Sequence, residues 1–271
     1  MNNPVLSPQE QLPASDWEHY ILYKTIKDLL IEIPHYFEST ISVSGVRATE
    51  IYPFSAVLGL MIEQEVVRTL NNLRQIWDAN KQYAGYRFIR QSQAFPDVLL
   101  MNPKTGHIIF GIELKCWYLL AKEGEPSFRY HATPNACTIA DLIVIVPWVL
   151  SNVLSGAPVI FNPFIASARY VAEYRNYWWQ HIRKAKSTSE IHSPSNVVPY
   201  PRSRDKISDH AESDSGNNFG RIARIGLLDT YAQSFRDLDL IGVTVSAWRA
   251  FLKAQPQEFD ISEVEDQDNE G

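Results

Sequence analysis

The sequence is poor in cysteine and lacks a long apolar run, and both shortages restrict what the chain can be. Its two cysteines, Cys116 and Cys137, are too few for a disulfide framework or a four-cysteine zinc site. The longest apolar stretch, at 142–150, is interrupted by Pro147 and falls short of the roughly 20 residues that cross a bilayer. The first residues lack the basic and then apolar pattern of a secretory signal. We therefore expect a cytoplasmic protein with no membrane role.

The chain also lacks an excess of positive charge, which nucleic-acid-binding proteins usually carry. It holds 25 basic and 31 acidic residues, for a net charge of −6. Seven of the acidic residues fall within 258–270, where no basic residue occurs, so the rest of the chain is close to neutral. The acidity is thus concentrated in a tail. The rest of the chain can still bind DNA through a few well-placed cationic side chains.

The pattern of apolar residues predicts a mixed α/β fold. Apolar residues at helical spacing predict helices at 15–33, with Ser15 or Asp16 as the cap, at 53–77, at 166–185 and at 245–254. Alternating or β-branched runs predict strands at 86–89, 95–101, 108–118, 141–148 and 158–161. The segment 187–218 is rich in Ser, Pro, Asn and charge and predicts a long loop.

Three charged residues fall on two of these predicted strands, which a short turn joins. Asp97 begins the first strand, and Glu113 and Lys115 lie in the second. Side chains two residues apart in a strand share a face. A hairpin turning about Thr105 pairs Met101 with Ile109, Leu99 with Gly111, and Asp97 with Glu113. The two carboxylates and the ammonium then converge on one face of the sheet.

Two opposed carboxylates repel each other unless a cation or a proton shares their site. Carboxylate oxygens suit a hard divalent ion such as Mg²⁺, so Asp97 and Glu113 are candidate ligands, with the backbone carbonyl of Leu114 as a further one. Lys115 would orient the attacking water or stabilise the transition state of phosphodiester hydrolysis. The alternative is a solvated hairpin face, on which Lys115 is an ordinary salt-bridge partner.

The motif Pro96-Asp97, followed by Glu113-Leu114-Lys115, resembles the PD-(D/E)XK nuclease superfamily over about residues 53–148. The resemblance implies a restriction-endonuclease-like mixed β-sheet flanked by helices. It also implies Mg²⁺ as cofactor, double-stranded DNA as substrate, a homodimer and, for a type II restriction enzyme, a cognate DNA methyltransferase. Segment 118–140 departs from the pattern, because it shows little helical signal where a crossover helix is expected. We divide the chain into an N-terminal helical extension (1–52), a nuclease core (53–165), a DNA-contacting or dimerisation part (166–257) and an acidic tail (258–271).

Glu63 is the candidate for a further acid at the site. It lies at the edge of the apolar face of the predicted helix 53–77, whereas Glu65 shares a face with Arg68 and Thr69. A carboxylate at such a position is costly unless a charged group meets it. Superfamily members often supply a metal-site acid from this helix, and Gly59 and Glu63 resemble that arrangement. The alternative is a structural carboxylate paired with a nearby arginine.

The predicted helix 166–185 and the loop after the second strand supply candidate DNA contacts. The helix interleaves basic and aromatic residues, which suits phosphate binding and base recognition. The candidates are Arg175, Asn176, Gln180 and Lys184 on the helix and Arg129 in the loop. In the alternative, the aromatic residues belong to the core and the cations form the solvated side of an amphipathic helix.

The sequence leaves three functions open. The first is a magnesium-dependent type II restriction endonuclease, which cuts both strands as a dimer. The second is a repair or recombination nuclease built on the same core. The third is a DNA-binding protein that has kept the fold and lost the reaction, although the intact set of Asp97, Glu113 and Lys115 argues against it.

Overall fold

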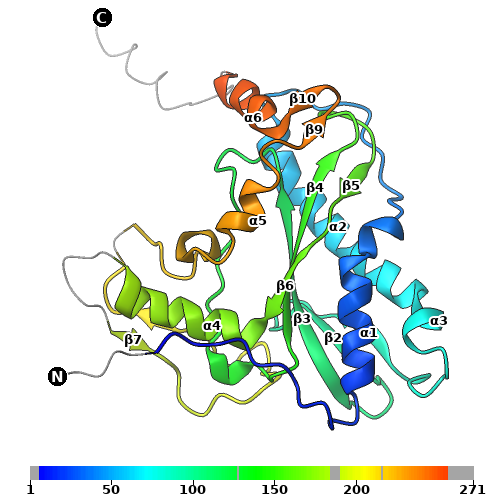
Figure 1. The fold of residues 1–271 in the computed structure, drawn as a ribbon, viewed down its shortest axis with the longest axis vertical. Helices are drawn as coiled ribbons and strands as arrows, with labels where there is room; N and C mark the ends of the chain where they lie inside the picture. Colours follow the sequence, from blue (N-terminus) through cyan, green and yellow to red (C-terminus); the bar gives the residue numbers. More distant parts are fainter. Residues whose placement is uncertain (1–5, 127, 184–189, 215, 256–271) are drawn as a thin grey trace, which may run out of the picture.

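The computed structural model describes residues 6–126, 128–183, 190–214 and 216–255. They form a mixed α/β fold around one six-stranded sheet (Figure 1). Five strands follow one another in the order β1-β2-β3-β4-β5, and β6 pairs with β4. The strands are β1 (Arg87–Arg90), β2 (Val98–Met101), β3 (Ile108–Tyr118), β4 (Leu142–Leu150), β5 (Pro158–Ile160) and β6 (Phe164–Ser167). β3 and β4 are parallel, and the other pairs are antiparallel.

Helices cover the sheet from two sides. In Figure 1, α1 and α3 lie on one side and α4 and α5 on the other, while α2 packs on β1 and β3. The helices are α1 (Tyr20–Ile31), α2 (Ile51–Asn72), α3 (Arg74–Trp77), α4 (Ala168–Tyr177), α5 (Asp229–Gln233) and α6 (Val245–Ala254). The short ribbons are β7 (Ile191–His192) with β8 (His210–Ala211) and β9 (Asp239–Leu240) with β10 (Val243–Thr244).

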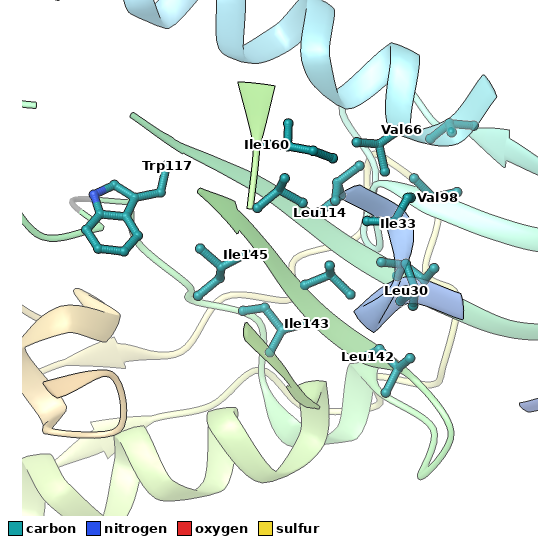
Figure 2. Packing of buried hydrophobic residues seen from close by; sticks show 14 of the residues in the cluster. Leu30, Ile33, Val66, Val98, Leu114, Trp117, Leu142, Ile143, Ile145 and Ile160 are labelled. Atoms are coloured by element: carbon teal, nitrogen blue, oxygen red, sulfur yellow. The ribbon is translucent and has the colours of Figure 1, made fainter. Parts of the chain in front are cut away.

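The core lies where β3 and β4 pack against the helices. Figure 2 shows Leu114 of β3 and Val98 of β2 beside Val66 of α2, with Leu30 of α1 and Ile33 close by. All nine residues of β4 are buried, as its continuous apolar run predicts for a strand covered on both faces. Residues of α1, α4 and α6 join the same apolar cluster as the sheet.

The structure confirms most of the predicted elements and corrects several boundaries. The first helix begins at Tyr20, and neither Ser15 nor Asp16 caps it, because residues 15–19 form turns instead. The second predicted helix is interrupted at Leu73, between α2 and α3. The predicted helix 166–185 begins at Ala168 because 164–167 forms β6, and after Tyr177 it continues as a π-helical turn, Trp178–Ile182.

Two connections also differ from expectation. The predicted loop 187–218 contains the β7–β8 ribbon, which the polar composition concealed. Between β3 and β4 the only described helical turn is a 3₁₀ turn, Pro134–Ala136, in line with the weak helical signal of this segment. Among the described residues no helix is both long and apolar enough to cross a membrane.

Candidate active site

Asp97, Glu113 and Lys115 meet on one face of the sheet, as the motif predicted. The Lys115 Nζ atom lies 2.8 Å from Asp97 Oδ2 and 2.8 Å from Glu113 Oε1. One ammonium therefore bridges the two carboxylates, which are close enough to share a cation. The Lys115 side chain is 22% exposed and that of Glu113 is 11% exposed. This burial argues against the alternative of a solvated hairpin face.

The register of the hairpin explains the convergence. Leu99 pairs with Gly111 and Val98 with Ile112, so continuing the ladder by one residue sets Asp97 opposite Glu113. The predicted partner of Met101 was wrong: Met101 pairs with Ile108, because the register shifts between Leu100 and Met101. The shift lies at the turn end of the hairpin and leaves the charged end in the predicted register.

The site lies at a fork where β2 ends while β3 continues. The β2–β3 ladder ends at Val98–Ile112, and from there β3 has no described strand on that side. The Leu114 N–H, which lies next in the ladder, donates to Asp97 Oδ2 at 3.0 Å. N–H and C=O groups of one strand residue point to the same side, so the Leu114 carbonyl faces the edge that Asp97 occupies. This orientation keeps it a candidate ligand.

Gly111 and Asp141, which the sequence did not single out as site residues, hold the start of β2 and the adjacent part of β3 in place. A side chain at Gly111 would collide with Pro96, since a Cβ atom there would lie 2.2 Å from Pro96 Cγ. Asp141 is fully buried at the start of β4 and accepts hydrogen bonds from the N–H groups of Gly111 and Thr138, each at 2.6 Å. Because Pro96 packs directly on the Gly111 backbone, the chain enters β2 in an orientation that points Asp97 toward Lys115. The sequence feature that could have indicated a buried role for Asp141 is its place directly before the apolar strand β4.

Burial and neighbouring charges shift the ionisation of the site. Burial, reinforced by the nearby charge of Asp97, raises the pKa of Glu113 to about 7 although Lys115 opposes the shift. Burial disfavours the charge on Lys115, but Glu113 and Asp97 outweigh it and hold the pKa of the ammonium above its usual range. A group that stays positively charged next to a carboxyl that titrates near neutrality can stabilise negative charge throughout the physiological pH range.

Glu63 of α2 lies beside this cluster and is paired with an arginine. Its Oε2 forms an ion pair with Arg90, which ends β1. The structural alternative for Glu63 predicted a nearby arginine partner, and this pair, made by Oε2, is present. Burial raises the pKa of Glu63, and Asp97 adds to the shift while Lys115, Arg90 and the N–H of Cys116 oppose it. Glu63 thus belongs electrostatically to the candidate site and is also paired with Arg90.

Gly59 lies where helix α2 crosses β3. A Cβ atom on Gly59 would lie 3.7 Å from Cys116 Cβ, an ordinary van der Waals contact, so Gly59 faces Cys116 of β3. Glu63 follows one turn later on the same face of α2. Gly59 and Glu63 thus have the positional relation that the resemblance implies.

Glu65 is more buried than the spacing indicated, since only 4% of the residue is exposed. Its carboxylate accepts hydrogen bonds from the Ser39 and Thr40 hydroxyls and from the Thr40 N–H, and it pairs with Arg68 at 3.0 Å. Burial alone would raise its pKa, but these donors outweigh it and lower the pKa. Glu65 therefore anchors the segment before α2, and the face that we assigned to it is confirmed.

The donor set fits a hard divalent cation. Asp97 and Glu113 already share a positive charge, and Asp97 Oδ1 accepts no hydrogen bond from a described residue. Asp97, Glu113 and the Leu114 carbonyl are all oxygen donors, which Mg²⁺ prefers. A second group of possible ligands, Glu190, His192 and Glu212, lies on the β7–β8 ribbon with ligand atoms within 4.8 Å of one another. All three are exposed, and exposed acidic groups of this kind are common on protein surfaces.

The structure corrects the prediction that Arg175 and Asn176 contact DNA. Arg175 is 1% exposed and donates to the carbonyls of Tyr130 and Ala132 at 2.6 and 3.1 Å. It also forms a buried ion pair with Asp209, to which the Asn176 amide donates at 2.8 Å. Both side chains are therefore used inside the protein. The alternative for this helix, with its cations on the solvated side, does not describe Arg175 either, because its guanidinium is buried.

The remaining DNA-contact candidates have different surroundings. Gln180 is exposed in the π-helical turn. Arg129 is exposed as well, and its guanidinium donates to the carbonyl of Asn217 at 2.8 Å. Lys184 lies outside the described residues. Gln180 and Arg129 keep their place as candidates.

Comparisons with protein-family models, with curated proteins and with solved structures each found no match. The function proposed below therefore depends on the geometry of the site and on the motif.

Proposed function

We propose that the protein is a magnesium-dependent DNA endonuclease that hydrolyses phosphodiester bonds of double-stranded DNA. The observation that carries the proposal is the bridge of Lys115 between Asp97 and Glu113 at the open end of the β2–β3 fork. A structural ion pair needs one carboxylate for one ammonium. Here Lys115 is shared by Asp97 and Glu113 while Arg90 pairs with Glu63, so the acids outnumber the cations by one, a balance that favours binding of a further cation.

Each residue has a distinct role in this proposal. Asp97 and Glu113 would hold Mg²⁺, which when bound polarises the phosphate and lowers the pKa of a bound water. Lys115 keeps its proton next to the two acids, so its ammonium can orient the attacking water or stabilise the charge that develops on the phosphate. Glu63 restrains Arg90 and adds negative charge to the cluster.

We further propose that the enzyme is a homodimeric type II restriction endonuclease with a cognate methyltransferase for the same site. The near-neutral body supports sequence-specific binding through a few placed contacts rather than binding by overall charge. A repair or recombination nuclease on the same core would use the same acids. A DNA-binding protein without activity is disfavoured, because all three charged residues of the motif are present and converge.

The test is incubation of the purified protein with a long unmethylated duplex in Mg²⁺ and, in parallel, in EDTA. We expect discrete fragments with Mg²⁺ and intact DNA with EDTA. Asp97→Asn protein, prepared in the same way, controls for contaminating nucleases and should leave the DNA intact. A smear would favour a nuclease without sequence specificity. No cleavage by the unmodified protein, over a range of duplexes and divalent ions, would contradict the proposal.

A further inference from the structure

We propose that a second phosphate group of the DNA strand binds in a cleft between residues 122–126 and α6, with Arg249 as its central contact. This inference rests on the proposed function and extends it to a particular part of the substrate. We call this cleft the cation cleft, because Lys122, Arg236, Arg249 and Lys253 all line it. Their side chains come from three separate segments of the chain.

The four cations lack carboxylate partners. Within the part of the chain that the structure describes, none of them forms an ion pair. Three acids, Glu123, Glu125 and Asp229, also border the cleft, but Glu125 is 3.5 Å from Arg224, a further cation at its edge. Clustered cations repel one another unless an anion joins them. The arginine fork matches the oxygens of a phosphate group, with which it can form two parallel hydrogen bonds.

Arg249 is held over a glycine that leaves room for it. Gly124 has a φ of +69°, and a Cβ atom there would lie 1.5 Å from Arg249 Nη2. The positive φ favours glycine here, and the Arg249 guanidinium occupies the space that a side chain at this position would fill. Burial lowers the pKa of Arg249 and the neighbouring Arg236 lowers it further, while Tyr52, Glu125 and Glu123 oppose the shift. The guanidinium thus lies close to a second cation.

Three buried polar atoms near Arg249 have no hydrogen-bond partner among the described residues. They are Arg249 Nε, the Tyr52 hydroxyl and the Tyr118 hydroxyl. Tyr52 and Arg249 influence each other electrostatically, as do Tyr52 and Tyr118, so the three groups are neighbours. A buried donor without an acceptor costs about 1–3 kcal/mol. Of these three residues Arg249 lines the cation cleft, so an anionic ligand there would offer acceptor oxygens to its guanidinium.

The cation cleft shares a wall with a second cleft that reaches Glu63 of the candidate active site. This second cleft is lined by Tyr52, Gly59, Glu63 and Cys116 and shares Lys122, Glu123, Glu125 and Pro126 with the cation cleft. The loop 122–126 is therefore a common wall between the surroundings of Glu63 and the surroundings of Arg249. A DNA strand whose scissile phosphate lies at Lys115 could follow this wall and present another phosphate to Arg249.

The experiment measures DNA binding in EDTA, so that it does not depend on cleavage. The affinity for a short fluorescent duplex is followed by anisotropy at several salt concentrations. Arg249→Gln and Arg236→Gln should each reduce the magnitude of the salt slope of log K, and the double variant should reduce it by about 1, because the two arginines neutralise one phosphate. Lys104→Gln is the matched control, since Lys104 is exposed in the β2–β3 turn. Its slope should equal that of the unmodified protein.

A second arm with inorganic pyrophosphate separates the two sources of phosphate. Weaker pyrophosphate binding by Arg249→Gln and Arg236→Gln, with an unchanged DNA slope, would indicate a site for free phosphates and overturn the inference. Unchanged slopes and unchanged pyrophosphate binding would overturn it as well. Arg236 is exposed, so Arg236→Gln keeps the test decisive if Arg249→Gln fails to fold. If the unmodified protein cleaves DNA but both variants keep its salt slope, phosphate binding in the cation cleft is refuted and the proposed function stands.

Discussion

The backbone N–H of Leu114 donates a hydrogen bond to the carboxylate of Asp97 at 3.0 Å, at the point where β3 loses β2 as its neighbour. Asp97 thus replaces a strand partner at the edge of the sheet and also supplies charge to the candidate site. Because its side chain is 26% exposed, the structural part of this role should be modest. The two roles can be separated by substitution.

Asp97→Asn keeps an oxygen that can accept from Leu114 and removes the negative charge. We expect cleavage to fall by about 10²-fold or more, while the free energy of unfolding changes by less than about 1 kcal/mol. Asp97→Ala should lose cleavage equally and also about 1 kcal/mol of stability, because the hydrogen bond to Leu114 is lost at a partly exposed position. Urea titration and a cleavage assay on both variants provide the measurement. Equal stability losses would show that the hydrogen bond to Leu114 contributes nothing.

Lys115→Ala tests the ammonium while leaving both acids in place. Cleavage should fall by about 10²-fold or more, because no fixed positive charge remains to act on the phosphate. Binding of a duplex in EDTA should be largely retained, since the Lys115 ammonium is neutralised by Asp97 and Glu113 in the metal-free protein. Lys115→Arg keeps the charge in a different shape and is the matched control. Undiminished cleavage by Lys115→Ala would overturn the assignment of the site.

Glu63 and Glu65 should respond oppositely in two assays. Glu63→Gln removes charge beside Asp97 and Lys115 and should slow cleavage, while Arg90 keeps a hydrogen-bond acceptor. Glu65→Gln weakens the contacts with Ser39, Thr40 and Arg68 and should cost about 1–3 kcal/mol of stability with little change in cleavage. Cleavage rates and urea midpoints of both variants are the measurement. Slower cleavage by Glu65→Gln than by Glu63→Gln would mean that the catalytic acid lies on the other face of α2.

The sequence was sufficient for the local features and insufficient for the long-range ones. Strand parity and the length of the turn predicted that Asp97, Glu113 and Lys115 converge, because a hairpin is a local structure. The burial of Arg175 depends on Asp209, which lies 34 residues away in a segment that the composition presents as a loop. The pairing of Glu63 with Arg90 joins a helix to a strand. Periodicity describes one element at a time and cannot indicate such partners.

The raised pKa of Glu113 predicts how the metal-free protein responds to pH. The folded pKa is about 7 and the ordinary value is 4.5, so between these values the folded state binds more protons than the unfolded state. Stability should therefore fall as pH rises from 4.5 to 7, by on the order of 3 kcal/mol from this group. Urea midpoints in EDTA at pH 5 and pH 8 measure the change. Glu113→Gln should show a smaller decrease, and an equal decrease would assign the effect to other groups such as Asp141, whose pKa burial raises to about 6.

The buried pair of Arg175 and Asp209 predicts a loss of stability rather than a loss of DNA contacts. Arg175→Ala leaves Asp209 charged and buried without its main partner, and it also removes donors from the carbonyls of Tyr130 and Ala132. Breaking such a pair costs about 3–5 kcal/mol. Arg169→Ala on the same helix is the control, because its pair with Glu173 is exposed and worth at most about 0.5 kcal/mol. Urea unfolding of both variants measures the difference. A small effect of Arg175→Ala on stability, combined with a flatter salt dependence of DNA binding, would return Arg175 to the DNA interface.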